Sequence, residues 1–279
     1  MLLSLPRQRQ LDLRQPVVMG ILNVTPDSFS DGGKYHQLDA ALYQAEQMLN
    51  DGAVILDVGG ESTRPGAADV SEADELQRVV PVIEALRQRF DCVISVDTSK
   101  AVVMSAAVQA GADMLNDVRA LQEPGALQVA VTAQLPVCLM HMQGAPRLMQ
   151  HAPQYRDVVA EVTQFLLQRA AECQQAGVRK EHIILDPGFG FGKSLAHNYE
   201  LLKQLDSFCA DGYPVLAGMS RKSMIGQLLN EPVEQRLAGS LACATIAAIK
   251  GARIIRVHDV KETVQAVRVV TAMQYGVEG

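Results

Sequence analysis

Two polar loops directly follow two apolar runs near the start of the chain. Residues 23–33 read Asn-Val-Thr-Pro-Asp-Ser-Phe-Ser-Asp-Gly-Gly and follow the apolar run 17–22. Residues 59–67 read Gly-Gly-Glu-Ser-Thr-Arg-Pro-Gly-Ala and follow the apolar run 53–58. A loop that only reverses the chain does not need so many hydroxyl, carboxylate and amide groups, and function often resides on such loops. The pattern predicts one shared site above two neighbouring strands.

Polar groups recur wherever an apolar run ends. The runs that we interpret as strands are 17–22, 53–58, 93–97, 113–116, 136–140, 182–186, 214–219 and 253–257. The groups at their carboxyl ends are Asn23, Asp57, Asp97, Asn116 with Asp117, His141, Asp186, Ser220 to Lys222, and Arg256 with His258. Active sites of parallel barrels form on that face, so these eight ends indicate a ring of functional groups.

Segments with a helical pattern alternate with these runs. They are 38–51, 72–89, 101–110, 124–134, 157–176, 198–206, 221–229 with 234–249, and 260–274. The strands are apolar throughout, as expected when both faces of a sheet are covered. Eight βα units predict an α/β fold of the (β/α)8 TIM barrel type, as a single domain over residues 1–279. An open doubly wound sheet is the alternative.

Composition excludes several classes of function. A net charge of −6 argues against a nucleic-acid surface, which needs basic patches. The five cysteines are scattered and form no CxxC pair, which favours reduced thiols and a cytoplasmic protein. The longest apolar stretch, 241–249, is too short to span a membrane, and the N-terminus lacks the features of a signal peptide. We expect small-molecule partners, without nucleic acid or membrane.

Three polar side chains at the predicted barrel mouth suit a flat heterocycle. Asp97 and Asp186 each read alone could cap a helix or pair within the core. Together they suit a ligand rich in N–H donors, because a carboxylate accepts two parallel hydrogen bonds from an amidine-like edge. Asn116 adds a donor and an acceptor. This trio describes recognition of an aminopyrimidinone.

The stretch Asp-Pro-Gly-Phe-Gly-Phe-Gly-Lys at residues 186–193 resembles a phosphate loop only at first sight. Pro187 stands where a P-loop needs glycine, and Lys193 stands where a dinucleotide fingerprint needs glycine. We interpret it as a tight loop whose glycines bring Phe191 against a flat ligand. Met140 packs either on that ligand or in the core. His141 and His151 are interpreted as structural or loop residues.

Other groups suit an anion. Ser220 opens the helix predicted at 221–229, where free N–H groups hold anions, although simple capping by Ser220 explains it equally well. Arg256 with Asn23 and Thr63 could form a phosphate pocket. His258 read alone is as well explained as a solvated loop histidine.

At this point the motifs resemble those of the dihydropteroate synthase family, in its enterobacterial form. They are residues 23–33, Asp-Val-Gly-Gly-Glu-Ser-Thr-Arg-Pro-Gly from 57, Ser-Val-Asp-Thr from 95, Asn-Asp-Val from 116, Asp-Pro-Gly-Phe-Gly-Phe-Gly-Lys from 186, Gly-Met-Ser-Arg-Lys from 218, and Arg-Val-His-Asp from 256. The resemblance covers nearly the whole chain in order. It implies condensation of 4-aminobenzoate with (7,8-dihydropterin-6-yl)methyl diphosphate to give 7,8-dihydropteroate and diphosphate, in an enzyme that is a sulfonamide target.

The resemblance also implies roles, carried over position by position. The pterin would be bound by Asp97, Asn116, Asp186 and Lys222, with the guanidinium of Arg256 stacked on its ring. The diphosphate would be held by Asn23, Thr63, Arg256 and His258, with Asn23 as a ligand of Mg²⁺. The aminobenzoate would lie beside Ser220 and Lys222, with Phe29, Pro65 and Phe191 as walls. Arg64, Met140 and Val257 complete the implied substrate contacts, and Asp97, Asp186, Lys222 and Arg256 the catalytic set.

Two expectations concern assembly and motion. The segment 237–249 is apolar or small nearly all round, which predicts a homodimer. Loops 24–35 and 61–70 are long for βα connections, and we expect them to close over bound diphosphate. Two other functions stay open. A corrinoid methyltransferase domain would not need these loops in this form, and a silent pterin-binding subunit would be expected to lose Asn23 or Arg256.

Overall fold

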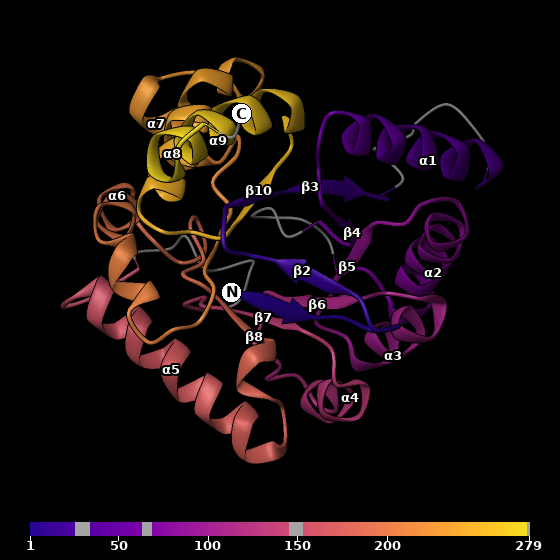
Figure 1. Cartoon of the computed structure of the whole chain (residues 1–279). Helices are drawn as coiled ribbons and strands as arrows, with labels where there is room; N and C mark the ends of the chain where they lie inside the picture. The colour runs from indigo at the N-terminus through magenta and orange to yellow at the C-terminus, as the bar shows by residue number, and fades with distance from the viewer. Residues whose placement is uncertain (26–33, 63–68, 145–152, 278–279) are drawn as a thin grey trace.

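The computed structural model describes residues 1–25, 34–62, 69–144 and 153–277, without the side chains of residues 34–36. Parallel strands alternate with helices throughout (Figure 1). The strands of the main sheet are β3 (Val17–Asn23), β4 (Ile55–Gly59), β5 (Val93–Asp97), β6 (Met114–Asp117), β7 (Val137–Met140), β8 (Ile183–Asp186), β9 (Leu216–Ala217) and β10 (Ile254–Val257). Each coincides with an apolar run of the sequence, so the predicted strands are confirmed.

The sheet closes on itself. Its strand order is β8-β7-β6-β5-β4-β3-β10-β9, and every neighbouring pair is parallel. A parallel bridge between Leu185 and Val215 joins the two edges. β9 is shorter than the predicted strand 214–219, and it begins after Pro214, which has no N–H for the ladder. The predicted (β/α)8 barrel is confirmed, and an open doubly wound sheet is excluded.

Helices surround this barrel. They are α1 (Lys34–Asn50), α2 (Glu72–Arg89), α3 (Ala101–Ala110), α4 (Ala126–Ala133), α5 (Val158–Ala176), α6 (Leu195–Lys203), α7 (Ser223–Leu229), α8 (Leu237–Ile249) and α9 (Val260–Tyr275), and the short 3₁₀ turns are η2 (Lys180–His182), η3 (Leu205–Cys209) and η4 (Val233–Gln235). Their apolar faces and the outer face of the sheet form the larger buried core. No helix in the described ranges has the length and apolar character needed to cross a membrane.

One layer of apolar side chains fills the lower barrel. Each strand contributes one buried residue to it: Met19, Ile55, Val93, Met114, Cys138, Ile184, Leu216 and Ile254. Four leucines from the N-terminal segment complete the same cluster: Leu3, Leu5, Leu11 and Leu13. These leucines lie on and beside a two-stranded hairpin, β1 (Leu2–Ser4) with β2 (Gln10–Asp12), which lies across the barrel (Figure 1). The hairpin, which the sequence analysis did not predict, therefore plugs the amino end of the barrel.

A buried carboxylate anchors this plug. Asp113 is fully buried at the start of β6, and its side chain accepts hydrogen bonds from the guanidinium groups of Arg7, Arg9 and Arg87. Its Oδ2 also accepts the backbone N–H of Ile94 at 3.0 Å. Since Arg7 and Arg9 belong to the hairpin segment, this cluster holds the plug against the sheet.

Candidate active site

The alternation of side chains along a strand explains why a polar layer lies directly above the apolar one. Successive side chains point to opposite faces, so residues two positions further along each strand also face the barrel interior. Two residues after Ile55, Met114 and Ile184 of the apolar layer, the same strands carry Asp57, Asn116 and Asp186. The complete second layer is Ile21, Asp57, Ser95, Asn116, Met140, Asp186, Gly218 and Arg256. The sequence thus places charged groups inside the barrel at its carboxyl end.

One guanidinium connects two carboxylates across this layer. Arg256 donates from Nε to Oδ2 of Asp57 at 2.6 Å and from Nη2 to Oδ2 of Asp97 at 2.6 Å. Asn116 donates from Nδ2 to the same oxygen of Asp57 at 3.0 Å. Asp57 is fully buried, whereas the side chains of Asp97 and Arg256 are 10% and 19% exposed. The predicted Asp97, Asn116 and Arg256 are therefore brought together on one network.

The charges of this network do not balance. Burial raises the pKa of Asp97 to about 7, against the lowering effect of Arg256, and the nearby Asp57 raises it further. Burial alone would lower the pKa of Arg256, but its two carboxylate partners raise it. We interpret these two pKa changes as the result of one cation that faces two carboxylates: Arg256 stays charged, and Asp97 takes up a proton more readily than an exposed aspartate.

Asp186 and Lys222 form the opposite side of the site. Oδ1 of Asp186 accepts the N–H of Gly188 at 2.7 Å. Burial raises the pKa of Asp186, against the effect of Lys222, and burial lowers the pKa of Lys222 to about 8, against the effect of Asp186. Lys222 donates to the carbonyl of Phe189, and its Nζ lies 4.3 Å from the ring centroid of Phe191. The ammonium is thus held at the mouth by backbone and aromatic contacts.

The glycine-rich loop after β8 is held from below by Lys193. Its Nζ contacts the carbonyls of His141, Gly188 and Phe191 and the ring Nδ1 of His141, at 2.9–3.2 Å. Gly188 has φ +71°, and a Cβ there would lie 1.9 Å from the carbonyl oxygen of His141, so only glycine fits. Burial, with the adjacent ammonium, lowers the pKa of His141 to about 3, which keeps the imidazole neutral. The structural role predicted for His141 agrees with these contacts.

Met140 and Phe191 form a small apolar cluster at the mouth. Both are buried, and the half-buried Val118 and Met142 pack against them, separately from the two larger cores. The sequence left open whether Met140 faces a ligand or the main core. Its place in this separate cluster, beside Asp186 on the neighbouring strand, favours a wall of the ligand site.

The Ser220 helix start requires a correction. Helix α7 begins at Ser223, and its N-cap is Lys222, which makes no side-chain capping bond. Ser220 instead accepts the backbone N–H of His258 at 3.2 Å, and its Oγ lies 3.1 Å from Nδ1 of His258. The helix starts later than predicted because residues 219–222 form a turn in which Arg221 has φ +57°. Ser220 thus links the end of β10 to the loop after β9, and the expectation that it opens or caps the helix is wrong.

The remaining predicted residues fall into two groups. Asn23 ends β3 and is half-buried, and Val257 ends β10 and is buried. Phe29, Thr63, Arg64 and Pro65 lie outside the described residues, as does His151 and most of the loops expected to close.

Asp57 is a functional residue whose role the sequence analysis did not assign. It was noted only as the polar end of an apolar run. Its position inside an apolar strand was the available signal, because a buried carboxylate must be paired. The structure supplies two partners, Arg256 and Asn116. Asp57 therefore orients the other members of the site.

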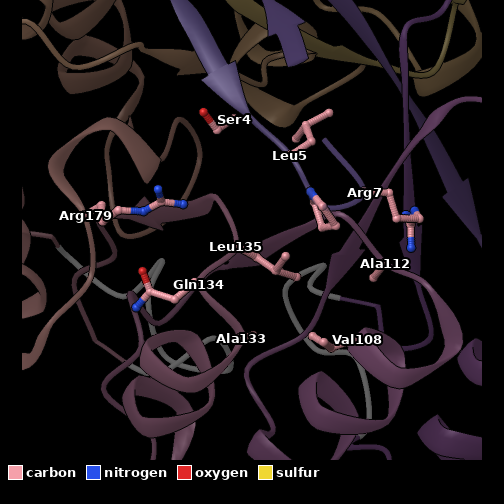
Figure 2. Close-up of a pocket in the computed structure, with 10 residues that line it drawn as sticks. Ser4, Leu5, Arg7, Val108, Ala112, Ala133, Gln134, Leu135 and Arg179 are labelled. Atoms are coloured by element: carbon pink, nitrogen blue, oxygen red, sulfur yellow. The ribbon is translucent and has the colours of Figure 1, made fainter. Parts of the chain in front are cut away.

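A cavity of about 290 Å³ lies beside the N-terminal hairpin (Figure 2), and none of its lining residues belongs to this network. Arg7, Arg179 and Gln134 line it, together with apolar side chains such as Leu135. Its polar groups are already engaged: Arg7 with Asp113, Arg179 with the ring of His182, and Gln134 with two backbone carbonyls. This cavity is consequently not the site of chemistry.

Comparison with known proteins agrees with this geometry. A family of proteins described as pterin binding enzymes matches residues 19–258. The dihydropteroate synthase of Escherichia coli strain K12 is 62% identical over 262 residues, which cover 94% of this chain and 93% of that protein. The fold and site define a pterin-binding barrel. The chain belongs to the pterin-binding enzymes and, within them, to the dihydropteroate synthase family.

Two solved structures match nearly the whole chain. A Yersinia pestis dihydropteroate synthase crystallised with a sulfonamide drug complex is 59% identical, with a TM-score of 0.94 over 98% of this chain and 99% of that one. A Xanthomonas albilineans dihydropteroate synthase with 4-aminobenzoic acid is 52% identical, with a TM-score of 0.91 over 96% of each chain. The similarity to dihydropteroate synthases therefore covers the backbone of the whole barrel as well as the sequence motifs.

Proposed function

We propose that this protein condenses (7,8-dihydropterin-6-yl)methyl diphosphate with 4-aminobenzoate to give 7,8-dihydropteroate and diphosphate. The observation that carries the proposal is the polar network at the barrel mouth. Arg256 joins Asp57 to Asp97 at the end of β5, and Asn116 and Asp186 lie in the same interior layer as Asp57. A barrel mouth with carboxylates, an amide and a fixed guanidinium matches a planar heterocycle with several N–H donors. Membership of the dihydropteroate synthase family supports the same substrates.

The pterin would lie between these groups. Asp186 offers its carboxylate to the N–H edge, and Asn116 offers an amide from the neighbouring part of the layer. Met140 and Phe191 provide an apolar wall for a flat ring. Lys222, at the edge of that wall, is placed to reach both the ring and an incoming aminobenzoate.

The chemistry needs binding and electrostatics rather than a nucleophile–base pair. The bond between the pterin methylene carbon and the diphosphate oxygen breaks, and the diphosphate keeps the electron pair. Asp97 and Asp186 then stabilise the positive charge shared by the methylene and the ring. The aniline nitrogen attacks the methylene carbon and loses its proton afterwards. Diphosphate would be held by Arg256, His258 and Thr63.

The residues present fit a magnesium ion that would take most of its ligands from water and substrate oxygens, with Asn23 as the protein group that would hold it. Among the described residues no group of three or more His, Cys, Asp or Glu side chains could hold a metal. Mg²⁺ with substrate phosphates commonly takes only one or two protein oxygens and keeps several waters. Asn23, at the end of β3, offers one neutral amide oxygen, which suits that requirement. When bound, the ion would neutralise the leaving diphosphate.

Catalysis is therefore expected to stop in EDTA and to return when Mg²⁺ is added in excess. Binding of (7,8-dihydropterin-6-yl)methanol, which carries no diphosphate, should be unaffected by EDTA because the ring groups are protein side chains. The measurements are product formation by chromatography and ring binding by calorimetry. Full turnover in metal-free buffer would contradict the proposal.

Pterin affinity is expected to pass through a narrow maximum near neutral pH. The pKa of Asp97 is raised to about 7, so below that value the carboxyl is protonated and accepts N–H donors poorly. The pKa of Lys222 is lowered to about 8, so above it the ammonium is lost. Each limb should fall by up to about tenfold for each pH unit, the limit for one proton.

This profile is measured as the Kd of (7,8-dihydropterin-6-yl)methanol by calorimetry across the pH range. Lys222→Met should weaken binding and remove the alkaline limb only. The free energy of unfolding should change in the opposite direction to pterin affinity on the acid side. Because the pKa of Asp97 in the folded protein lies above its ordinary 3.8, the contribution of Asp97 to stability is full at low pH and is lost as pH rises through about 7. A Kd that is flat across this range would refute these assignments.

We infer further that the protein is a homodimer through α7 and α8. Leu228 and Leu229 on α7 and Leu237, Ile246 and Ile249 on α8 are exposed, although all are large and apolar. The inner residues of α8 are already buried against the barrel, so the outer ones need a second surface. These helices lie together on one side of the molecule (Figure 1).

Sedimentation at micromolar concentration should therefore give a dimer. Ile246→Glu is expected to shift it to a monomer, because a charge would be buried in the interface. The matched control is Val102→Glu, on the outer side of α3, where the valine is 49% exposed; it should leave the assembly unchanged. A wild-type monomer at this concentration would count against the inference.

A further inference from the structure

Lys100 lies three residues after Asp97 and makes two ion pairs outside the site described above. Its Nζ lies 2.5 Å from Oε2 of Glu61 and 2.5 Å from Oε2 of Glu75. Glu61 follows β4, and Glu75 lies in the first turn of α2. One ammonium therefore joins the connection after β4, the first turn of α2 and the connection after β5.

Glu61 joins the two described ends of the connection between β4 and α2 by a hydrogen bond to Val70. While its Oε2 faces Lys100, its Oε1 accepts the backbone N–H of Val70 at 3.1 Å. Arg78 on α2 also donates to the carbonyl of Gly60, at 2.9 Å. The two described ends of this connection are thus tied to each other and to α2. Residues 63–68, which lie between them, are outside the described residues.

The burial of Glu75 makes Lys100 difficult to replace. The side chain of Glu75 is fully buried, whereas those of Lys100 and Glu61 are 23% and 29% exposed. A buried carboxylate needs a paired charge, so the Lys100–Glu75 pair fixes the ammonium in place. Burial alone would lower the pKa of Lys100, but its hydrogen bonds to Glu61 and Glu75 raise it. The fixed ammonium can then hold the more exposed Glu61.

We propose that Lys100 is a positioning residue, which through Glu61 fixes both ends of the connection that carries Thr63, Arg64 and Pro65. Lys100 and Glu61 line a cavity of about 410 Å³ that also reaches Asp97, so this anchor borders the active site. The identity of the affected substrates rests on the proposed function. The expected consequence is that loss of the anchor weakens use of the aminobenzoate and leaves pterin ring binding intact. The proposed ring contacts on β5, β6, β8 and β10 are side chains of the barrel strands, and neither Glu61 nor Lys100 is one of them.

Hydrogen exchange tests the anchor without reference to activity. In Glu61→Met, which keeps the buried Lys100–Glu75 pair but has no oxygen to accept the Val70 N–H, and in Lys100→Met, the amide of Val70 should exchange at least about tenfold faster than in the wild type. Lys100→Arg should restore most of the protection, because it keeps the charge. Arg119→Met is the matched control, since Arg119 lines the same cavity but makes its ion pair with Glu123, four residues further along the chain. Unchanged exchange at Val70 in Glu61→Met and Lys100→Met would overturn the proposal.

Kinetics test whether the anchor positions the site. In Glu61→Met and Lys100→Met, kcat/KM for 4-aminobenzoate should fall by about tenfold or more, while Kd for (7,8-dihydropterin-6-yl)methanol stays within about twofold. An equal loss in both quantities would overturn the proposal, because it would place the effect at Asp97. A wild type without condensation activity would refute the proposed function, and the exchange experiment would still decide the anchor.

Discussion

Arg256→Met is expected to slow condensation severely and to destabilise the barrel at the same time. The guanidinium is the hydrogen-bonding cation between Asp57 and Asp97, and both bonds are 2.6 Å long. Without it, a fully buried carboxylate and its neighbour face each other without compensation. Breaking a buried pair in this way typically costs about 3–5 kcal/mol of stability. Loss of a preorganised charge at the reacting centre should lower kcat/KM by about 10²–10³ or more.

Urea unfolding and steady-state kinetics measure the two effects separately. Arg256→Lys should keep part of the stability but little of the activity, because an ammonium cannot reach both carboxylates with a planar fork. Arg253→Met is the matched control: Arg253 lies just before the same strand at the amino end of the barrel, where it contacts the carbonyl of Arg14 and the hydroxyl of Tyr275. Its replacement should leave kcat/KM unchanged. Near-normal activity in Arg256→Met would contradict the assigned role.

Asp186→Asn is expected to weaken pterin binding by about 2–5 kcal/mol, the usual scale when one partner of a buried charged hydrogen-bond pair is removed. The fold should survive, because an asparagine oxygen can still accept the N–H of Gly188. Lys222 would lose its nearest opposing charge, and its pKa should fall further. Calorimetry with (7,8-dihydropterin-6-yl)methanol measures the affinity.

Asp117→Asn provides a sharp comparison. Asp117 is also a buried carboxylate near the end of a strand, but it accepts from Ser99 and from the backbone N–H groups of Arg119 and Leu121. Its replacement should therefore lower stability and leave pterin affinity unchanged. If Asp186→Asn and Asp117→Asn had the same effect on affinity, Asp186 would not be a ligand-binding group.

Much of the architecture was predictable because local patterns determine it. A strand covered on both faces must be apolar, so the eight runs stood out, and the barrel rule then placed Asp97, Asn116 and Asp186 on one face. The N-terminal hairpin was not predictable from the sequence pattern because its strands are only three residues long. Its leucines are explained only by the barrel that they plug, and that context is absent from the local sequence.

The same limit applies to the pairing within the site. Asp57 and Arg256 are 199 residues apart, and no spacing rule connects them. The predicted role of Ser220 at the helix start was wrong because its hydroxyl accepts the N–H of His258, which follows β10, rather than an N–H of the following helix. Residues at strand ends were thus predictable, whereas their partners across the barrel were not.

The central claim is tested most directly by mixing the purified wild-type protein with (7,8-dihydropterin-6-yl)methyl diphosphate, 4-aminobenzoate and Mg²⁺, and by measuring both products. We predict that 7,8-dihydropteroate and diphosphate appear in equal amounts, and that both form at least about a hundredfold more slowly in Arg256→Met. If the wild type binds the pterin but forms no dihydropteroate, it is a silent pterin-binding protein. If it transfers a methyl group from a methylated folate instead, it is a methyltransferase, and either result would contradict the account.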